Sequence, residues 1–416
     1  MATASHSEIG LRGRAAARVL RAAPTADRDA ALEAIARRLE ADADAILAAN
    51  AEDVAEAVAA GTSAALVDRL TLDADRLAAL AAAVRDVARL DDPVGRTVED
   101  RVLHNGLELT KVRVPIGRVL VVYEARPNVT VDVAALCIKS GNVALLRGSA
   151  SARRTNAALA AAVRGGLADA GLPEDAVIPV EGSREDLGEL VADAGAADIV
   201  VPRGGEALKD FLLERSRIPV LAAAGGNCHV YLDADADADM AVAIAVNAKA
   251  QRPGVCNAAE TLLVHEDRLD LLPAVLGALR DAGVELRGDE RARAAAGFEI
   301  AAATEDDWGT EYLDLIMAVR VVDDLDAALD HIDRYSTGHS EAIVTDSIEA
   351  SRRFVDGVDS ACVYVNASTR FTDGGEYGMG AEVGNSTARL HVRGPIGLED
   401  LTTTKYVVIG SGQTRG

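Results

Sequence analysis

The sequence of 416 residues contains little lysine, few aromatic residues and fewer basic than acidic residues. Lysine supplies five of the 43 basic residues, the first being Lys111, and aromatic residues make up 3%. The 66 acidic residues leave a formal net charge of −23, and a field of that sign repels nucleic acid and anionic membrane surfaces. We therefore expect neither as a partner. An acidic, lysine-poor, alanine-rich composition is typical of a halophile's cytoplasmic protein, and the codon bias of a GC-rich genome produces the same composition.

Long apolar runs and clustered metal ligands are also missing. No run approaches the roughly 18 apolar residues of a membrane-spanning helix, and the first residues, MATASHSEIGLRGR, lack the apolar core of a signal peptide. The four cysteines and seven histidines are scattered, with no CxxC spacing. This pattern argues against a disulfide framework and a zinc site. We expect a cytoplasmic protein in a reducing compartment, with no metal.

The length and a 49% hydrophobic content indicate a globular chain of two to three domains. Residues 11–90 have the apolar spacing of helices. From 117 to 222 short apolar strands alternate with helices, and a second region of the same kind begins near His229. This alternation predicts an α/β fold with parallel sheets, which bind ligands at the carboxyl ends of their strands.

Two further segments are predicted to form strands outside these alternating regions. Asn105-Gly106 lies between two β-rich runs and predicts a hairpin with a type I′ turn, which requires positive φ at both residues. TTTKYVVIG near the end predicts a terminal strand. The expected organisation is a dinucleotide-binding domain at 1–100 and 118–228, a catalytic domain at 229–390, and an oligomerisation arm at 101–117 and 391–416.

Two turns between a strand and a helix are candidate anion sites. In NVALLR-GSAS the glycine precedes the helix that contains Arg153 and Arg154, and in DIVVP-RGG it precedes the helix that begins near Glu206. Backbone N–H groups at a helix N-terminus attract anions. No GxGxxG lies between a strand and a helix, so the classical Rossmann fingerprint is absent. DADADAD at 233–239 has Ala238 and Ile244 where a calcium loop needs Gly and Glu, which favours a solvated acidic face.

Cys256 is the best candidate nucleophile. It follows Arg252-Pro253-Gly254 in a loop, and a nearby guanidinium favours the reactive thiolate. An inert buried thiol is the alternative, and it suits Cys137 and Cys362, which lie in apolar runs. Cys228 stands beside His229, but adjacent residues on a strand point to opposite faces, which argues against a dyad.

Several long motifs then carry a resemblance. They are YEARPNVTVDVAALCIKSGN, VPRGG, GNCHVYLD, AKAQRPGVCNAAETLLV, DWGTEYLDLI, STGHSEAIVT and VYVNASTRFTDGGEYGMGAEVG. From about residue 10 to 410, the chain resembles the gamma-glutamyl phosphate reductases, also called glutamate-5-semialdehyde dehydrogenases, of the aldehyde dehydrogenase superfamily. The resemblance implies two doubly wound α/β domains with parallel sheets and a β-hairpin arm. It also implies NADPH-dependent reduction of L-glutamyl 5-phosphate to L-glutamate 5-semialdehyde in proline biosynthesis.

The resemblance assigns roles to particular residues. Cys256 matches the nucleophile that forms a thioester, and Asn128 matches the oxyanion-hole asparagine. Hydrolytic aldehyde dehydrogenases place a glutamate before the glycine pair that matches Gly225-Gly226. Here Ala222, Ala223 and Ala224 occupy that stretch. Without a base to activate water, the thioester survives for reduction.

The resemblance also implies binding residues. For the anionic substrate they are Arg126, Arg252 and Arg370, each with a surface or structural ion pair as the alternative. For NADP they are Arg147, Gly148, Ser149, Gly204, Gly205 and Asp314. The family usually has Lys after RGG, whereas this chain reads Arg147-Gly148-Ser149-Ala150. Arg153 or Arg154 is a candidate to compensate.

Other readings stay open. One is another acylating aldehyde dehydrogenase that uses CoA or phosphate, and a second is a catalytically dead scaffold, against which the intact QRPGVC loop argues. We expect a homo-oligomer, a dimer or a tetramer. Because no kinase domain is apparent in the sequence, transient contact with a separate glutamate 5-kinase is a further expectation.

Overall fold

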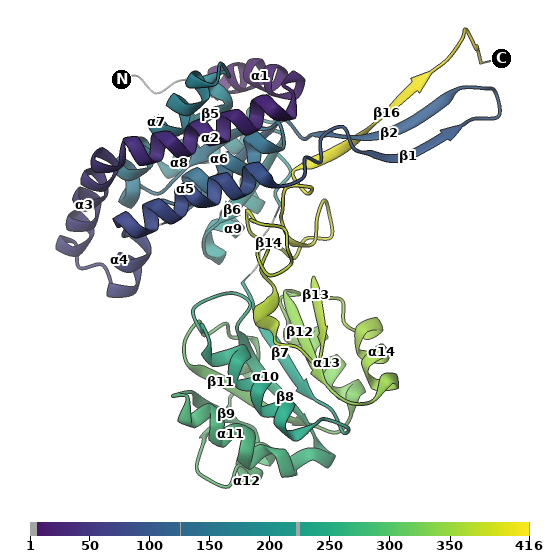
Figure 1. Ribbon diagram of the computed structural model, residues 1–416. Helices are drawn as coiled ribbons and strands as arrows, with labels where there is room; N and C mark the ends of the chain where they lie inside the picture. Colours follow the sequence, from purple (N-terminus) through teal and green to yellow (C-terminus); the bar gives the residue numbers. More distant parts are fainter. Residues whose placement is uncertain (1–5, 125, 222–224, 416) are drawn as a thin grey trace. The chain divides into compact units, whose positions relative to one another are not determined.

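The computed structural model describes residues 6–124, 126–221 and 225–415 (Figure 1). The chain forms two compact units. The first comprises Met1–Ala222, Gly378–Gly384 and Ile396–Gly416, and the second comprises Ala223–Tyr377 and Asn385–Pro395. The expected boundaries at 228 and 390 are therefore wrong in detail, because residues 225–228 belong to the second unit and 378–384 to the first. Among the described residues, no helix combines the length and apolar character that a membrane crossing requires.

The first unit opens with helices, as the apolar spacing predicts. They are α1 (His6–Ala22), α2 (Thr25–Ala41), α3 (Ala43–Ala59), α4 (Ala64–Leu70) and α5 (Ala74–Arg89). On α2 the periodic residues Leu32, Ile35 and Leu39 are fully buried. The helix packs against α5 and against α7 (Arg153–Asp169). A β-carbon at Gly166 of α7 would lie 2.6 Å from the Ile35 backbone nitrogen, so glycine permits this close helix contact.

A four-stranded parallel sheet forms the core of the first unit. Its order is β5-β4-β3-β6, with β3 (Arg118–Tyr123), β4 (Val143–Arg147), β5 (Val177–Pro179) and β6 (Ile199–Arg203). The strands are continuous apolar runs because the sheet is buried. The connecting helices are α6 (Val129–Lys139), α7, α8 (Arg184–Ala192) and α9 (Glu206–Arg215).

Two local expectations in this unit have different outcomes. Ser183-x-x-Asp186 in the sequence predicts a capping box, and it is confirmed, because Ser183 accepts from the Asp186 backbone N–H and Asp186 accepts from that of Ser183. The apolar run IPVLA at 218–222 predicts a further strand, but in its described part, 218–221, Val220 makes only an isolated bridge to Val200. Pro219, the residue before Val220, has no N–H to continue a ladder.

An antiparallel arm of β1 (Thr97–Val102), β2 (Glu108–Pro115) and β16 (Thr402–Ile409) projects from the helices of the first unit (Figure 1). The hairpin and the terminal strand are confirmed. The type I′ turn is wrong, because Gly106 has a φ of 81° whereas Asn105 is not among the residues with positive φ. Gly106 N donates to Leu103 O at 2.9 Å, so a turn precedes a single left-handed glycine.

The second unit is built on a seven-stranded parallel sheet of order β10-β9-β11-β8-β7-β12-β13. The strands are β7 (Cys228–Leu232), β8 (Ala259–His265), β9 (Glu285–Gly288), β10 (Ala301–Ala302), β11 (Ile316–Val322), β12 (Ser340–Val344) and β13 (Cys362–Val365). A short pair, β14 (Asn385–Ser386) and β15 (Gly394–Pro395), adds a separate ribbon. The parallel sheet matches the fold class that the sequence predicts.

Helices cover both faces of this sheet. Val230 and Leu232 of β7 face α10 (Ala238–Ala250), α11 (Leu272–Asp281) and α12 (Glu290–Ala295). Tyr231 points the other way, toward α13 (Leu325–Tyr335) and α14 (Ile348–Gly357). The sequence analysis missed α13, although Asp324 accepts from the Ala327 N–H as its N-cap and Leu325, Ala328 and Ile332 have helical spacing.

Candidate active site

Cys256 lies in the loop between α10 and β8 and is partly exposed, whereas Cys137, Cys228 and Cys362 are buried. Burial raises the pKa of the Cys137 thiol to about 12. Burial, together with the negative charge of Glu341, raises the pKa of Cys228 well above its usual range. Of the four thiols, Cys256 is the one that a reagent in solution can reach.

The backbone of Cys256 is held against the start of β7. Its carbonyl oxygen accepts from Cys228 Sγ at 3.2 Å. A β-carbon at Gly226 would lie 1.4 Å from the same oxygen, so no larger residue fits there. Gly226 N in turn donates to Glu311 Oε1 at 2.6 Å. These segments precede β7, β8 and β11, which places the site at the amino edge of the sheet.

Arg370 lies beside the Cys256 loop. Its Nε donates to Gln251 Oε1 at 2.8 Å, and its Nη1 donates to Asn257 Oδ1. Burial and the positive charge of Arg252 lower the pKa of the Arg370 guanidinium. Arg252 itself is exposed. Two of the three expected substrate arginines are therefore neighbours of the Cys256 loop.

A buried ion pair beneath this loop was missed by the sequence analysis. Lys249 Nζ and Glu260 Oε2 are 2.5 Å apart, and both side chains are fully buried. Glu260 Oε1 also accepts from Leu313 N at 3.2 Å, which ties the ion pair to the segment that carries Glu311. Burial raises the pKa of Glu260 to about 7 and lowers that of Lys249. The sequence signal that could have indicated this ion pair was Lys249, the one lysine in an alanine-rich helix.

In the first unit, Asn128 stands at the start of α6, directly after β3 and its loop. Its Nδ2 donates to Asp132 Oδ2 at 2.8 Å. Burial raises the pKa of Asp132 to about 6, although the bond from Asn128 and the positive charge of Arg203 oppose the shift. Asp132 therefore orients the Asn128 amide with its nitrogen toward the carboxylate. Arg126 is exposed two residues earlier.

Expected cofactor residues follow β4 and β6, the two strands that flank β3 in the sheet of the first unit. Arg147 ends β4 and donates to the Gly182 and Gly148 carbonyls, while Ser149 Oγ lies 2.5 Å from Ser151 Oγ. After β6, Gly205 N donates to Glu124 Oε2 at 3.2 Å. These groups share the carboxyl edge of the parallel sheet, where dinucleotides bind in such folds.

The glycines at this edge differ in what surrounds them. A β-carbon at Gly204 would lie 2.7 Å from Glu124 Cδ, and one at Gly148 would lie 2.2 Å from Asn156 Nδ2, but one at Gly205 would meet nothing within 4 Å. Gly205 therefore leaves an open backbone approach at the start of α9.

Two other residues that the sequence analysis linked to the cofactor, Arg154 and Asp314, have polar partners of their own. Arg154 Nη1 contacts Asp53 and Glu56, and its Nε contacts Glu52, so carboxylates already neutralise the charge expected to compensate for the altered motif. Asp314 belongs to the second unit, whereas the other cofactor candidates belong to the first, and its Oδ1 accepts from Leu315 N at 2.8 Å. Ala222, Ala223 and Ala224 lie outside the described residues.

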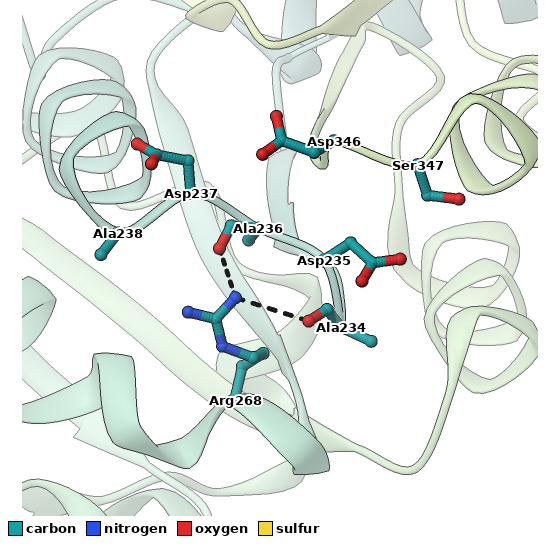
Figure 2. Close-up of a pocket in the computed structure, with 8 residues that line it drawn as sticks. All are labelled: Ala234, Asp235, Ala236, Asp237, Ala238, Arg268, Asp346 and Ser347. Atoms are coloured by element: carbon teal, nitrogen blue, oxygen red, sulfur yellow. Dashed lines mark hydrogen bonds between the residues drawn. The ribbon is translucent and has the colours of Figure 1, made fainter.

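The acidic segment after β7 lines a pocket at the opposite, carboxyl edge of the second sheet. Figure 2 shows Asp235, Asp237 and Asp346 around it, with Arg268 donating to the Ala236 and Ala234 carbonyls. In the part of the chain that the structure describes, no three His, Cys, Asp or Glu side chains are grouped to hold a metal ion. Because the pocket lies at the carboxyl edge of the sheet and Cys256 at the amino edge, the pocket is separate from the Cys256 loop.

Comparison with known proteins decides the family. The aldehyde dehydrogenase family profile matches residues 8–290. The chain belongs to the aldehyde dehydrogenase family. It is 53% identical to a gamma-glutamyl phosphate reductase of Thermobifida fusca over 93% of each chain, and 51% identical to one of Moorella thermoacetica over 98% of this chain and 97% of that protein.

Solved structures agree with the family assignment. The crystal structure of gamma-glutamyl phosphate reductase from Thermotoga maritima has a TM-score of 0.97 and 45% identity, covering 99% of this chain and 100% of that one. An acetylating aldehyde dehydrogenase from Geobacillus thermoglucosidasius, 17% identical over 99% of this chain and 97% of that one, has a TM-score of 0.70 and shares the fold. The aldehyde dehydrogenase fold predicted from the motifs is confirmed.

Proposed function

We propose that the protein catalyses NADPH-dependent reduction of L-glutamyl 5-phosphate to L-glutamate 5-semialdehyde and phosphate, the reductive step of proline biosynthesis from glutamate. The observation that carries this proposal is the identity of about half of all positions, over nearly the full length, with proteins named gamma-glutamyl phosphate reductase. The exposed Cys256 in an otherwise buried set of thiols supports it, because acyl transfer to sulfur requires a reachable nucleophile.

Cys256 acts as the nucleophile. Its thiolate attacks the acyl carbon, the bond from that carbon to the phosphate oxygen breaks, and inorganic phosphate leaves with the bonding electrons. The product is a thioester on Cys256. Reduction gives a thiohemiacetal, and when the carbon–sulfur bond breaks the aldehyde leaves and the thiolate is restored. Asn128 donates its second amide N–H to the oxygen that becomes negative, an interaction of ~3–4 kcal/mol in the transition state.

The nicotinamide cofactor supplies the hydride for the thioester. We assign it to the carboxyl edge of the first sheet, where Arg147, Gly148 and Ser149 follow β4 and Gly204 and Gly205 follow β6. The residues fit, because Gly205 is exposed and a β-carbon there would meet nothing within 4 Å. Asp314 is assigned to the ribose. Preference for NADPH over NADH belongs to this proposal, and Ser149 is the residue we assign to the 2′-phosphate.

The substrate carries an acyl phosphate and an α-carboxylate, and we assign Arg126, Arg252 and Arg370 to these charges. Arginine presents a planar fork that matches either group. Arg252 and Arg370 raise the positive potential beside Cys256 in the second unit. Arg252 lies in the same loop as Cys256, and Arg370 contacts that loop through Gln251.

Two assays test the function. With Ala222, Ala223 and Ala224 in place of a general base, water should not deacylate the thioester, so oxidation of glutamate semialdehyde by NADP⁺ should require inorganic phosphate. Full-rate oxidation in phosphate-free buffer would contradict this. Acyl-CoA substrates serve as the control that separates other acylating aldehyde dehydrogenases.

The nucleophile has its own test. Cys256→Ser should keep the fold and lose nearly all turnover, because a neutral hydroxyl is a weaker nucleophile. Cys137→Ser, Cys228→Ser and Cys362→Ser are the matched controls and should retain substantial activity. Near-normal turnover by Cys256→Ser would rule out the thioester mechanism.

We further propose a cytoplasmic homo-oligomer, a dimer or tetramer, joined through the arm of β1, β2 and β16. In this proposal the first unit binds the dinucleotide and the second carries the catalytic cysteine. Glutamyl phosphate is a labile acyl phosphate, so transient contact with a separate glutamate 5-kinase would shorten its exposure to water.

A further inference from the structure

One guanidinium spans the two ends of the Cys256 loop. Arg370 Nε donates to Oε1 of Gln251, five residues before Cys256, and Arg370 Nη1 donates to Oδ1 of Asn257, the residue after it. The guanidinium is planar and its N–H groups have fixed spacing. Its two bonds therefore set the separation of the residues that flank the nucleophile.

Asn257 is itself anchored to the segment that carries Arg370. Its side chain is buried, and its Nδ2 donates to Thr372 O at 2.8 Å. The Thr369 hydroxyl donates to Asn257 O at 2.7 Å. Asn257 is thus a fixed point, and the bond from Arg370 to the exposed Gln251 holds the other end of the loop relative to it.

Arg252 differs from Arg370 in each of these respects. It is exposed, and no carboxylate in the described part of the chain forms an ion pair with it. It lies close enough to Arg370 for its positive charge to lower the pKa of the Arg370 guanidinium. An exposed guanidinium without a bound carboxylate keeps its full fork for an incoming anion.

We infer that Arg370 is a positioning residue that holds the Cys256 loop through Gln251 and Asn257, and that Arg252 is the guanidinium that binds the phosphoryl group. This assignment rests on the proposed function and divides the roles that the resemblance gave jointly to the two arginines. The loop held by Arg370 places the Cys256 thiolate for attack, whereas Arg252 determines how tightly phosphate or acyl phosphate is held.

A double-mutant cycle between Gln251 and Arg370 tests the inference. Gln251→Leu removes the acceptor at similar volume, Arg370→Lys removes the fork and keeps the charge, and Gln251→Glu keeps an acceptor. Two quantities are measured: the alkylation rate of Cys256 by iodoacetamide, followed by peptide mass spectrometry, and kcat and the phosphate KM for semialdehyde oxidation.

The cycle should show coupling. Each single change should lower kcat about tenfold and alter the alkylation rate about threefold or more, with the phosphate KM within about twofold of wild type. The double variant should be no worse than the worse single variant, and Gln251→Glu should restore both quantities. Arg252→Lys should raise the phosphate KM about tenfold and leave alkylation unchanged. Arg353→Lys, an exposed ion-pair residue on α14, is the matched control.

Two results would overturn the inference. One is an alkylation rate and a kcat in Gln251→Leu that equal those of the wild type. Because Gln251 is exposed, this variant should fold, and it tests the inference even if Arg370→Lys does not fold. The other is a raised phosphate KM in Arg370→Lys with unchanged alkylation, which would make Arg370 a phosphate ligand. Alkylation is read without turnover, so failure of the proposed function, seen as activity in Cys256→Ser, is distinguished from failure of the positioning role.

Discussion

The carbonyl oxygen of Cys256 occupies the place of the side chain that residue 226 lacks: a β-carbon on Gly226 would lie 1.4 Å from that oxygen and 2.4 Å from the carbonyl carbon. Gly226 is not among the glycines with positive φ, so the requirement is close approach rather than backbone conformation. The segment just before β7 and the Cys256 loop are thereby in direct backbone contact.

Gly226→Ala should therefore displace the Cys256 loop. We expect turnover to fall by about two orders of magnitude, because a misplacement of about 1 Å is enough for a loss of that size. Gly277→Ala on α11 is the control: its β-carbon meets nothing within 4 Å, and the change should raise stability by about 0.5–1 kcal/mol. Steady-state kinetics and urea unfolding measure the two effects. Wild-type turnover by Gly226→Ala would contradict the contact.

The Lys249–Glu260 ion pair should matter to stability when one member is removed. Lys249→Met leaves a buried carboxylate unpaired and should cost about 3–5 kcal/mol of unfolding free energy. Lys249→Met combined with Glu260→Gln removes both charges and keeps an acceptor for Leu313 N, so most of the loss should be recovered. Urea denaturation at neutral pH measures the cycle, and additive losses would show that the ion pair is not coupled.

Acid should destabilise the second unit below pH 6.5. Burial lowers the pKa of His331 to about 2 and that of His339 to about 4, from 6.5. Between pH 6.5 and 4.5 the unfolded chain binds these protons and the folded chain does not, so stability falls as the pH falls, by about 1.4 kcal/mol per pH unit for each histidine.

The effect of Glu260 on stability has the opposite sign throughout that range. Its raised pKa of about 7 means that the folded chain holds a proton that the unfolded chain has lost above pH 4.5, so its contribution rises as the pH falls. Two histidines against one carboxyl leave a net loss of about one proton. His339→Asn should flatten the dependence of Tm on pH between 7 and 5, and an unchanged slope would contradict the assignment.

The arm should carry an intersubunit contact. On β16 the side chains of Tyr406, Val408 and Ile409 are 58%, 50% and 60% exposed, and the strand lies at the edge of its sheet. Exposed apolar edge strands are usually covered. Ending the chain after Leu401 should lower the assembly mass measured by light scattering or reduce solubility, whereas ending it after Gly410 should not. An unchanged mass without β16 would count against the arm.

Salt should raise the melting temperature if the acidic composition is an adaptation to high salt. With a net charge of −23, self-repulsion weakens the compact state at low ionic strength, and screening relieves it. Tm should therefore increase from low to molar KCl. A Tm that is insensitive to KCl would assign the composition to genomic codon bias.

Much of the fold could be read from local pattern. The continuous apolar strands of the first unit, the Ser183–Asp186 capping box and the terminal strand β16 each depend on neighbouring residues, and each is confirmed. Gly106 was correctly placed in a hairpin, but its turn type was wrong, because Asn105 is compatible with more than one turn and the flanking register chooses among them. The loop composition made Cys256 a candidate nucleophile, and the resemblance, not periodicity, supplied the role proposed for Asn128.

The sequence by itself determined most of the strand–helix alternation, the parallel sheets and the loop that contains Cys256, since helix and strand periods and loop composition are local. Tertiary structure alone decided what surrounds that loop. Gly226 meets the Cys256 carbonyl, and Arg370 reaches Gln251 and Asn257, across separations of about 30 to 119 residues. Contacts at such separations form only when the fold brings together segments that are distant in sequence, and they leave no periodic signal in the chain.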